Sequence, residues 1–230
     1  MAAKEKKNKV FVDYGRQLDI FNPENFTDIL TVIGAGGIGS PTVIVLSKIG
    51  CPRIEVYDPD TIELHNLPNQ FFRHTDLDRK KVEALKEIVE ELTGTVIEVH
   101  PKLYVDQPFA PGIVISAVDK MEQRKAIWKK VKMNPSVKLF IDARMGGEVA
   151  RIYAINPVDL DEVNFYEKTL YSDEEASTEK CTAKAIMYNV FVIAGIIGDL
   201  VKKRACRQNL PKEILVDLVT LSMVTKWKVS

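Results

Sequence analysis

The stretch Gly34-Ala35-Gly36-Gly37-Ile38-Gly39-Ser40 decides the fold of this chain. It follows the apolar run Ile29–Ile33 and precedes a second one, Val43–Leu46. A strand, a glycine turn and a helix start form a cradle for phosphate, because glycine lets the backbone approach an anion and the first helical turn offers unpaired N–H groups. Four glycines should line this nucleotide-binding loop: Gly34, Gly36, Gly37 and Gly39.

Strand and helix patterns alternate outward from the glycine loop. Helices are expected at 41–49, 79–92 and 120–132, between strands at 29–33, 53–57, 95–100 and 113–118. This alternation predicts an α/β fold with a Rossmann-like, mostly parallel sheet and helices on both faces. Antiparallel strands should extend the sheet in the C-terminal half, with strands at 137–143 and 148–155, a turn at 144–147 and one extended segment at 215–227.

Two segments show no strand or helix pattern. Residues 156–180 carry eight acidic residues and two lysines without a clear period, so we expect a mobile crossing loop there. The start of the chain is polar and lacks the apolar core of a signal peptide. Residues 1–13 are expected to form a flexible tail. A buried helix should begin near residue 185, and its apolar run is shorter than the roughly 20 residues of a membrane span.

Charge and cysteine content exclude several classes of function. The chain has 32 basic and 32 acidic residues, which gives no net attraction to nucleic acid or to a membrane surface. Its three cysteines form no C-x-x-C pair, so we expect no structural zinc. An odd number of separated cysteines fits a reduced, cytoplasmic protein.

Two aspartates follow predicted strands. Asp58 lies 19 residues after Gly39, a spacing that suits a carboxylate bound to a ribose hydroxyl. Asp119 ends the fourth parallel strand, where a carboxylate can hold Mg²⁺ against phosphate oxygens. Each has a structural alternative, since Asp58 could cap the turn after its strand and Asp119 could cap the following helix.

Two cations and one thiol are further candidates. Lys81 and Arg16 could neutralise phosphate charge, although a lysine at a helix start is more often simply solvated. Cys181 has Lys180 and Lys184 beside it, and neighbouring lysines favour the thiolate. The alternative for this cysteine is a small buried apolar residue.

Several motifs occur in the order in which one family carries them: Gly34-x-Gly36-Gly37-x-Gly39-Ser40, Asp58-x-Asp60, Asn66-Leu67, Gln70, Lys81-Val82-Glu83 and Ser116-Ala117-Val118-Asp119. They resemble the ThiF/MoeB/HesA group and the adenylation domains of ubiquitin-activating enzymes. Tyr14-Gly15-Arg16-Gln17 resembles the Arg-Tyr-x-Arg-Gln opening of that family. The resemblance implies that residues 1–230 form a single adenylation domain of this type.

The resemblance implies an activity and its cofactors. The family binds ATP and Mg²⁺ and adenylates the C-terminal glycine carboxylate of a ubiquitin-like or sulfur-carrier protein. Asp119 then matches the Mg²⁺ aspartate, Asp58 the ribose aspartate, and Asn66 and Lys81 phosphate-side groups. Asp60 and Gln70 belong to the same nucleotide-binding motifs.

The resemblance also implies partners. Arg16 matches an arginine that reaches the neighbouring subunit's site, which implies a homodimer. The pair Cys181-Thr182 resembles the family's thiol at the end of the crossing loop, which in some members takes the activated protein as a thioester. A conjugating enzyme or a sulfurtransferase would then be a further partner.

The chain departs from the family pattern at two points. Asn69 stands where the family has arginine in Asn-Leu-x-Arg-Gln, and Arg73 or Arg79 could compensate. The cysteine pairs that bind zinc in many members are missing, which argues against a MoeB-like sulfur-carrier role more than against adenylation. Asp142-Ala-Arg144-Met-Gly146 resembles a segment of compact bacterial members.

Three alternative functions stay open. A NAD-dependent oxidoreductase would use the same glycine loop, but the three histidines show no proton-relay arrangement: His65, His74 and His100. A non-catalytic subunit would explain Asn69. Adenylation of a peptide or of a tRNA-borne carboxylate is the third alternative.

Overall fold

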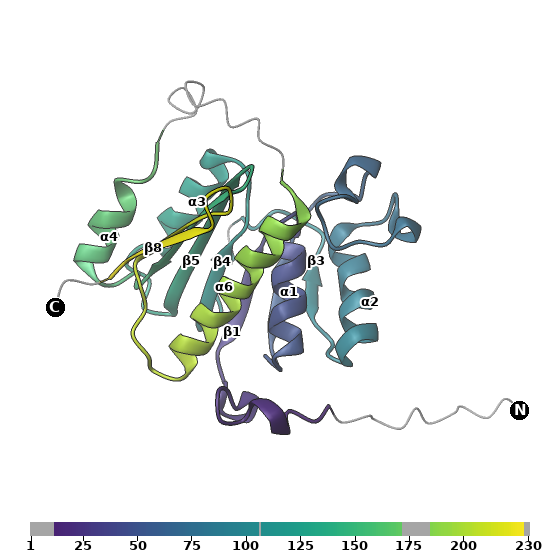
Figure 1. The fold of residues 1–230 in the computed structure, drawn as a ribbon, viewed down its shortest axis with the longest axis horizontal. Helices are drawn as coiled ribbons and strands as arrows, with labels where there is room; N and C mark the ends of the chain where they lie inside the picture. The colour runs from purple at the N-terminus through teal and green to yellow at the C-terminus, as the bar shows by residue number, and fades with distance from the viewer. Residues whose placement is uncertain (1–11, 106, 172–184, 228–230) are drawn as a thin grey trace, which may run out of the picture.

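The strands of this chain build one eight-stranded sheet, seen in a computed structural model that describes residues 12–105, 107–171 and 185–227 (Figure 1). Their order in the sheet is β3-β2-β1-β4-β5-β6-β7-β8. The strands are β1 (Ile29–Ile33), β2 (Ile54–Tyr57), β3 (Glu98–His100), β4 (Gly112–Ser116), β5 (Val137–Gly146), β6 (Val149–Ile155), β7 (Glu213–Asp217) and β8 (Ser222–Lys226).

The first five strands of the chain are parallel, and their register brings candidate residues to one edge of the sheet. Ile33 at the end of β1 pairs with Tyr57 of β2 and with Ser116 of β4. The residues that follow these three strand ends therefore meet at the carboxyl edge, where open α/β sheets bind ligands. The glycine loop, Asp58 and the segment leading to Asp119 share that edge.

Helices cover both faces of the sheet. A core cluster on one face joins the strands to α1 (Gly39–Lys48), α2 (Lys81–Thr93) and α6 (Met187–Ala205). A second cluster on the other face includes residues of α3 (Met121–Val131) and α4 (Leu160–Glu167). The predicted fold class is confirmed, since buried β-branched strands fill the space between the two helical layers.

Helix α4 corrects the prediction of an unbroken loop over 156–180. Asp159 caps the helix, and its side chain accepts hydrogen bonds from the backbone N–H groups of Asp161 and Glu162. Val163 and Tyr166 are buried on one side. Eight residues hold too few turns for a periodic pattern to show in a sequence window. Residues 172–184 of the predicted loop lie outside the described residues.

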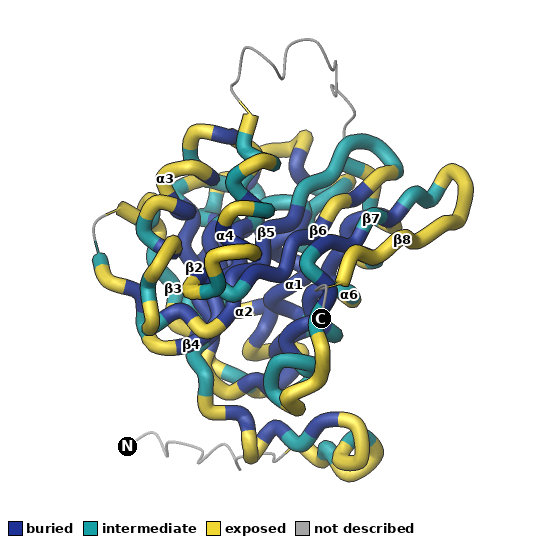
Figure 2. Tube along the Cα trace, turned by 90° about the vertical axis from the view of Figure 1, so that its left-hand side faces the viewer, coloured by how far each residue is buried: buried dark blue, intermediate teal, exposed yellow. Residues whose placement is uncertain are grey.

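The C-terminal strands differ from the prediction in their turns. Strand β5 runs on to Gly146, so the turn to β6 falls at residues 147–148 and not at 144–147. The single extended segment predicted at 215–227 is wrong, because β7 and β8 form an antiparallel hairpin. This hairpin projects from the body of the protein with its β8 strand exposed (Figure 2). Apolar residues keep alternating across the hairpin turn, so the sequence pattern does not indicate that a turn is present.

The last helix, α6, extends beyond the apolar run and ends at Ala205. Lys202, Lys203 and Arg204 lie in its last turn, where cations interact favourably with the helix dipole. Within the described parts of the chain, none of the helices has the length and apolar character needed to cross a membrane.

Candidate functional site

The glycine loop between β1 and α1 is held in a conformation that side chains would prevent. Gly34 has φ +99°, and a Cβ atom there would lie 2.6 Å from the carbonyl oxygen of Ala117. A Cβ atom on Gly39 would lie 1.8 Å from the carbonyl oxygen of Gly34. The loop can therefore fold this tightly against the end of β4 only with glycine. At the start of α1, Ser40 N–H donates to Gly36 O and Thr42 N–H donates to Ile38 O, so the backbone N–H groups that could bind an anion here are those of the loop residues 36–39.

Asp58 closes the glycine loop from β2. Its carboxylate is buried, and Oδ2 accepts a hydrogen bond of 2.7 Å from the backbone N–H of Ala35. Oδ1 accepts one of 2.8 Å from the backbone N–H of Asp60. The structural alternative, an aspartate that orders the turn after its strand, is thus present. Each oxygen keeps a second lone pair, so the predicted contact with a ribose hydroxyl stays a prediction compatible with this arrangement.

Lys81 at the start of α2 is buried and ion-paired. Its Nζ lies 2.9 Å from Oδ2 of Asp60, and the side chain is 8% exposed, whereas that of Asp60 is 61% exposed. The alternative of a simply solvated lysine is therefore wrong. Through Asp60 and Asp58, the ammonium group is linked by hydrogen bonds to the glycine loop.

The segment from Asn66 to Gln70 lies beside the glycine loop. Asn66 is buried, and its Oδ1 accepts a hydrogen bond of 2.9 Å from the backbone N–H of Glu63. Nε2 of Gln70 lies 3.9 Å from the place where a Cβ atom of Gly36 would stand. The side-chain oxygens of Asn69 and Gln70 are buried and have no hydrogen-bond partner among the described residues. Buried acceptors normally have a donor, so these oxygens fit a site that a ligand completes.

Arg73 and Arg79 do not take the place of the arginine that Asn69 replaces. Arg73 Nε lies 2.9 Å from Oδ2 of Asp76, and Arg79 Nη2 lies 2.5 Å from Oε1 of Glu87. Although burial opposes it, the hydrogen bond from Arg73 lowers the pKa of Asp76. Both guanidinium groups are thus engaged by carboxylates, and the expected compensation is not seen.

Asp119 lies beyond β4 with its side chain exposed. Helix α3 is preceded by Lys120 as its cap residue, without a side-chain capping bond, so the capping alternative for Asp119 is wrong. Among the described residues, Asp119 has no hydrogen bond or ion pair. Its backbone neighbours are nevertheless fixed, because Ala117 N–H donates to Ile33 at 2.8 Å and Arg124 Nη2 donates to Val118 O at 2.6 Å. A carboxylate that is free but well positioned fits a Mg²⁺ ligand.

A buried ionic network supports this edge from the side of α3 and α4, and the sequence analysis did not identify it. Asp142 on β5 is fully buried and accepts hydrogen bonds from Arg124 Nε at 2.6 Å, Arg144 Nε at 2.8 Å and Tyr166 Oη at 3.0 Å. Burial and the Asp142 carboxylate raise the pKa of Tyr166, so its hydroxyl stays a donor. The same Arg124 holds the backbone next to Asp119, which links the network to the candidate site.

Replacing Asp142 should destabilise the protein strongly. Asp142→Ala leaves the guanidinium groups of Arg124 and Arg144 without their buried carboxylate, and breaking a buried ion pair in this way costs about 3–5 kcal/mol. Denaturant unfolding followed by circular dichroism measures the change. Lys138→Ala on the same strand is the control, because its pair with Asp28 is partly exposed and should contribute less than about 1 kcal/mol. Equal effects of the two changes would contradict the structural role of the network.

Arg16 is not brought to the glycine loop of its own chain. It is exposed in the short helix η1 (Gly15–Gln17), and Gln17 Nε2 donates to Ile49 O at 2.8 Å, at the far end of α1. The glycine loop lies at the other end of that 10-residue helix, about 15 Å away along its axis. The predicted role of Arg16 at the site of a neighbouring copy stays a prediction.

The cysteines differ in their surroundings. Cys181 lies outside the described residues. Burial raises the pKa of Cys51 to about 12, which makes this thiol inert, whereas Cys206 is exposed. Among the residues that the structure describes, no group of three or more His, Cys, Asp or Glu side chains could hold a metal ion.

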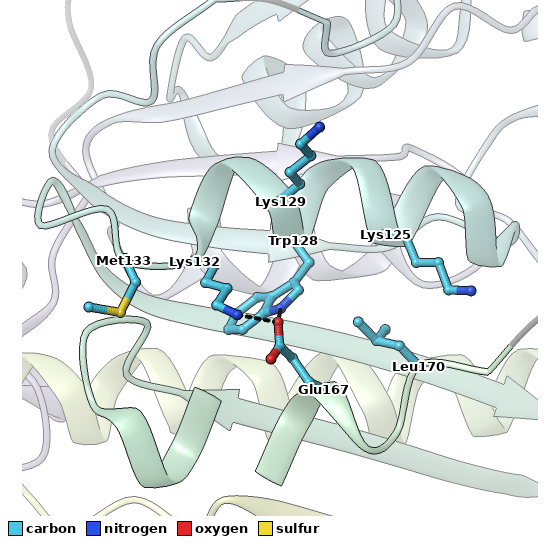
Figure 3. Close-up of a pocket in the computed structure, with 7 residues that line it drawn as sticks. All are labelled: Lys125, Trp128, Lys129, Lys132, Met133, Glu167 and Leu170. Atoms are coloured by element: carbon cyan, nitrogen blue, oxygen red, sulfur yellow. Dashed lines mark hydrogen bonds and ion pairs between the residues drawn. The ribbon is translucent and has the colours of Figure 1, made fainter. Parts of the chain in front are cut away.

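An open pocket of about 570 Å³ lies between α3 and α4 (Figure 3). Glu167 at its centre accepts hydrogen bonds from Trp128 Nε1 at 3.3 Å and from Lys132 Nζ at 2.6 Å. None of its lining residues belongs to the glycine loop or to the carboxyl-edge segments: Lys125, Trp128, Lys129, Lys132, Met133, Glu167 and Leu170. The pocket is thus separate from the candidate site.

Comparisons with known proteins agree with this geometry. The model of the ThiF family matches residues 14–225. Ubiquitin-like modifier-activating enzyme 5 of Xenopus laevis is 28% identical over 213 residues, which are 78% of this chain and 52% of that enzyme. Adenylyltransferase and sulfurtransferase UBA4 of Candida albicans is 38% identical over 72 residues, which are 30% of this chain and 16% of that protein. The chain thus spans about half or less of these relatives.

Solved structures share the fold. The crystal structure of E. coli MccB with ATP superposes with a TM-score of 0.71 at 17% identity, covering 97% of this chain and 71% of that one. The crystal structure of PaaA superposes with a TM-score of 0.71 at 17% identity, covering 89% of this chain and 74% of that one.

Proposed function

This chain belongs to the ThiF family, and on that basis we propose that it uses ATP to adenylate the C-terminal carboxylate of a ubiquitin-like or sulfur-carrier protein ending in Gly-Gly. One observation carries the proposal: the glycine loop, the buried Asp58 and the unpartnered Asp119 meet at the carboxyl edge of the parallel strands. Relatives named as modifier-activating enzymes and adenylyltransferases support it.

The first reaction step needs positioning and charge neutralisation more than acid–base catalysis. The attacking carboxylate is already ionised at neutral pH. Its oxygen forms a bond to the α-phosphorus while the bond to the leaving pyrophosphate breaks, so no proton has to be removed. The protein therefore has to hold the two reactants in line and stabilise charge on the phosphate oxygens.

The residues of this edge suit those tasks. The backbone N–H groups of the glycine loop, residues 36–39, would bind phosphate, and Asp58 would bind the ribose. Asp60 holds the Lys81 ammonium in place for a phosphate oxygen. Asp119 would hold Mg²⁺, which neutralises phosphate charge when bound. The buried side-chain oxygens of Asn69 and Gln70 could accept hydrogen bonds from donor groups of a ligand, but they do not replace the charge of the family's arginine toward phosphate.

The second step of the proposal is transfer to Cys181. The thiolate attacks the acyl carbon of the adenylate, a thioester bond forms, and AMP leaves with the electrons of the broken bond. The lysines beside Cys181 in the sequence favour its thiolate form. Three residues lie between Cys181 and Ala185, so the four steps along the chain span at most about 14 Å. Ala185 O lies 3.5 Å from Nδ2 of Asn69, beside the glycine loop.

ATP–pyrophosphate exchange tests the proposal. We expect the purified chain to incorporate labelled pyrophosphate into ATP only when Mg²⁺ and a Gly-Gly-ended carrier protein are both present, because exchange requires reversible adenylate formation. A carrier that lacks its last glycine is the matched control. The absence of exchange with every candidate carrier would favour the non-catalytic subunit, and tight binding of NAD without binding of ATP·Mg²⁺ would favour the oxidoreductase.

A further inference from the structure

The outer face of α3 is basic in a chain whose charges balance overall. Residues 120–132 carry five lysines, one arginine and a single acidic residue. Lys125 and Lys129 are exposed and four positions apart, so they lie on the same side of the helix, where like charges destabilise it. Neither amine forms a hydrogen bond, ion pair or ring contact with another residue that the structure describes. The helix therefore holds two cations that nothing in the described chain neutralises.

The open pocket between α3 and α4 sets these two lysines beside apolar side chains (Figure 3). Trp128, Met133 and Leu170 line it together with Lys125 and Lys129. Met133 has φ +57°, a left-handed conformation that suits glycine and is uncommon for a residue with a side chain. The residue is 50% exposed, so it extends the apolar surface at the edge of the pocket. Apolar surface next to free cations is a combination that an amphipathic anion would match.

The carboxylate that lines the pocket is already engaged. Glu167 accepts hydrogen bonds from Lys132 Nζ at 2.6 Å and from Trp128 Nε1 at 3.3 Å. The bond from Lys132 lowers the pKa of Glu167 although burial opposes it, so the group stays ionised at neutral pH. Glu167 would repel an anion at the centre of the pocket. An incoming anion therefore has to bind on the α3 side, at Lys125 and Lys129, with its apolar part toward α4.

We propose that this pocket binds an acidic peptide segment of a partner protein, in which carboxylates flank one apolar side chain. Charge complementarity with Lys125 and Lys129 selects the acidic class, and Met133 and Leu170 receive the apolar side chain. Nucleic acid fits less well, because its evenly charged backbone needs a continuous basic track and Glu167 interrupts this one. A small molecule fits less well, because its sites enclose most of the ligand whereas this pocket is open.

Tryptophan fluorescence can follow the binding at the pocket itself. The chain has two tryptophans, and Trp227→Phe leaves Trp128 as the single one. Titration with the peptide acetyl-Asp-Glu-Leu-Glu-Asp-amide should change its emission in a saturable way, and calorimetry with the unmodified protein should give the same affinity. Raising the ionic strength from about 0.1 M to about 1 M shortens the Debye length from about 10 Å to about 3 Å and should weaken binding roughly tenfold. No binding of millimolar peptide in either measurement would overturn the proposal.

Three variants separate the charged part of the pocket from its apolar part. Lys125→Glu and Lys129→Glu should each weaken peptide binding at least about fivefold, because an attraction becomes a repulsion. The control is Arg53→Glu, an exposed cation just before β2, which should bind the peptide like the unmodified protein. Met133→Gly removes apolar surface at a position whose backbone suits glycine, so it should weaken binding without loss of stability. Equal binding by Lys129→Glu and Arg53→Glu would overturn the proposal.

Control ligands identify the class of the occupant. The same peptide with lysine in place of its acidic residues should not bind, and the peptide with serine in place of leucine should bind several-fold more weakly. A single-stranded oligonucleotide that binds more tightly than the acidic peptide, and loses affinity in Lys129→Glu, would overturn the proposal in favour of nucleic acid. The proposal does not depend on the proposed function: peptide binding by a protein without ATP–pyrophosphate exchange would leave it standing, and exchange without peptide binding would overturn it alone.

Discussion

Asp119→Ala should lower carrier-dependent ATP–pyrophosphate exchange by about 10³-fold, because removal of one preorganised electrostatic group from an active site costs about 10²–10³ and a lost metal ligand costs at least as much. The carboxylate is exposed and has no partner among the described residues, so no fold-stabilising contact is lost. The free energy of unfolding should therefore stay unchanged. This combination distinguishes a metal ligand from a structural aspartate such as Asp142.

The control for this variant is Asp161→Ala, which removes an exposed carboxylate from the first turn of α4 without touching the carboxyl edge. It should retain full exchange. Binding of ATP, followed by calorimetry with and without Mg²⁺, gives a second measurement, in which Asp119→Ala should lose the increase in affinity that Mg²⁺ provides. Exchange that survives the Asp119 change would show that this residue is not the magnesium ligand.

The parallel half of the fold and the carboxyl edge could be predicted from the sequence because their signals are local. The apolar run before Gly34 and the glycines after it mark the strand, the turn and the helix within a few residues. Parallel strands also meet at one edge by topology, so the positions of Asp58 and Asp119 followed from where their strands end.

The parts that were missed depend on contacts between distant residues. The ion pairs of Asp142 join β5 to α3 and α4, and no spacing in the sequence indicates that Arg124 and Tyr166 meet at one carboxylate. The burial of Lys81 depends in the same way on Asp60, which is 21 positions earlier in the chain. Helix α4 was missed because an 8-residue helix in an acidic region leaves only two buried apolar positions as a signal.

The resemblance predicts a role for Arg16, whereas the structure gives its position in the chain. The motif around Tyr14 predicted a residue that acts on a neighbouring copy. The contact between Gln17 and Ile49 fixes the Arg16 segment at the end of α1 opposite the glycine loop, and the action on a neighbouring copy stays a prediction. A single chain therefore holds every candidate group at the carboxyl edge except this arginine and Cys181, which lies outside the described residues.

Cys181→Ala should abolish the thioester and leave exchange unchanged, because the two steps use different groups. Adenylate formation needs the carboxyl edge alone, whereas the thioester needs a thiol as nucleophile. Incubation with ATP, Mg²⁺ and the carrier protein, followed by gel electrophoresis with and without reductant, should show a reductant-sensitive adduct in the unmodified protein and none in the variant. Mass spectrometry of the bound nucleotide should show that the variant still forms the adenylate.

Cys206→Ala is the matched control, because Cys206 is the exposed cysteine among the described residues and Cys51 is buried with a pKa of about 12. An adduct that persists in Cys181→Ala and disappears in Cys206→Ala would move the acceptor role to Cys206. An adduct lost in neither variant would mean that the activated carboxylate passes directly to a partner's nucleophile. Loss of both adduct and exchange in Cys181→Ala would instead mean that this residue supports the adenylation site itself, since a pure acceptor thiol cannot affect a step that precedes its attack.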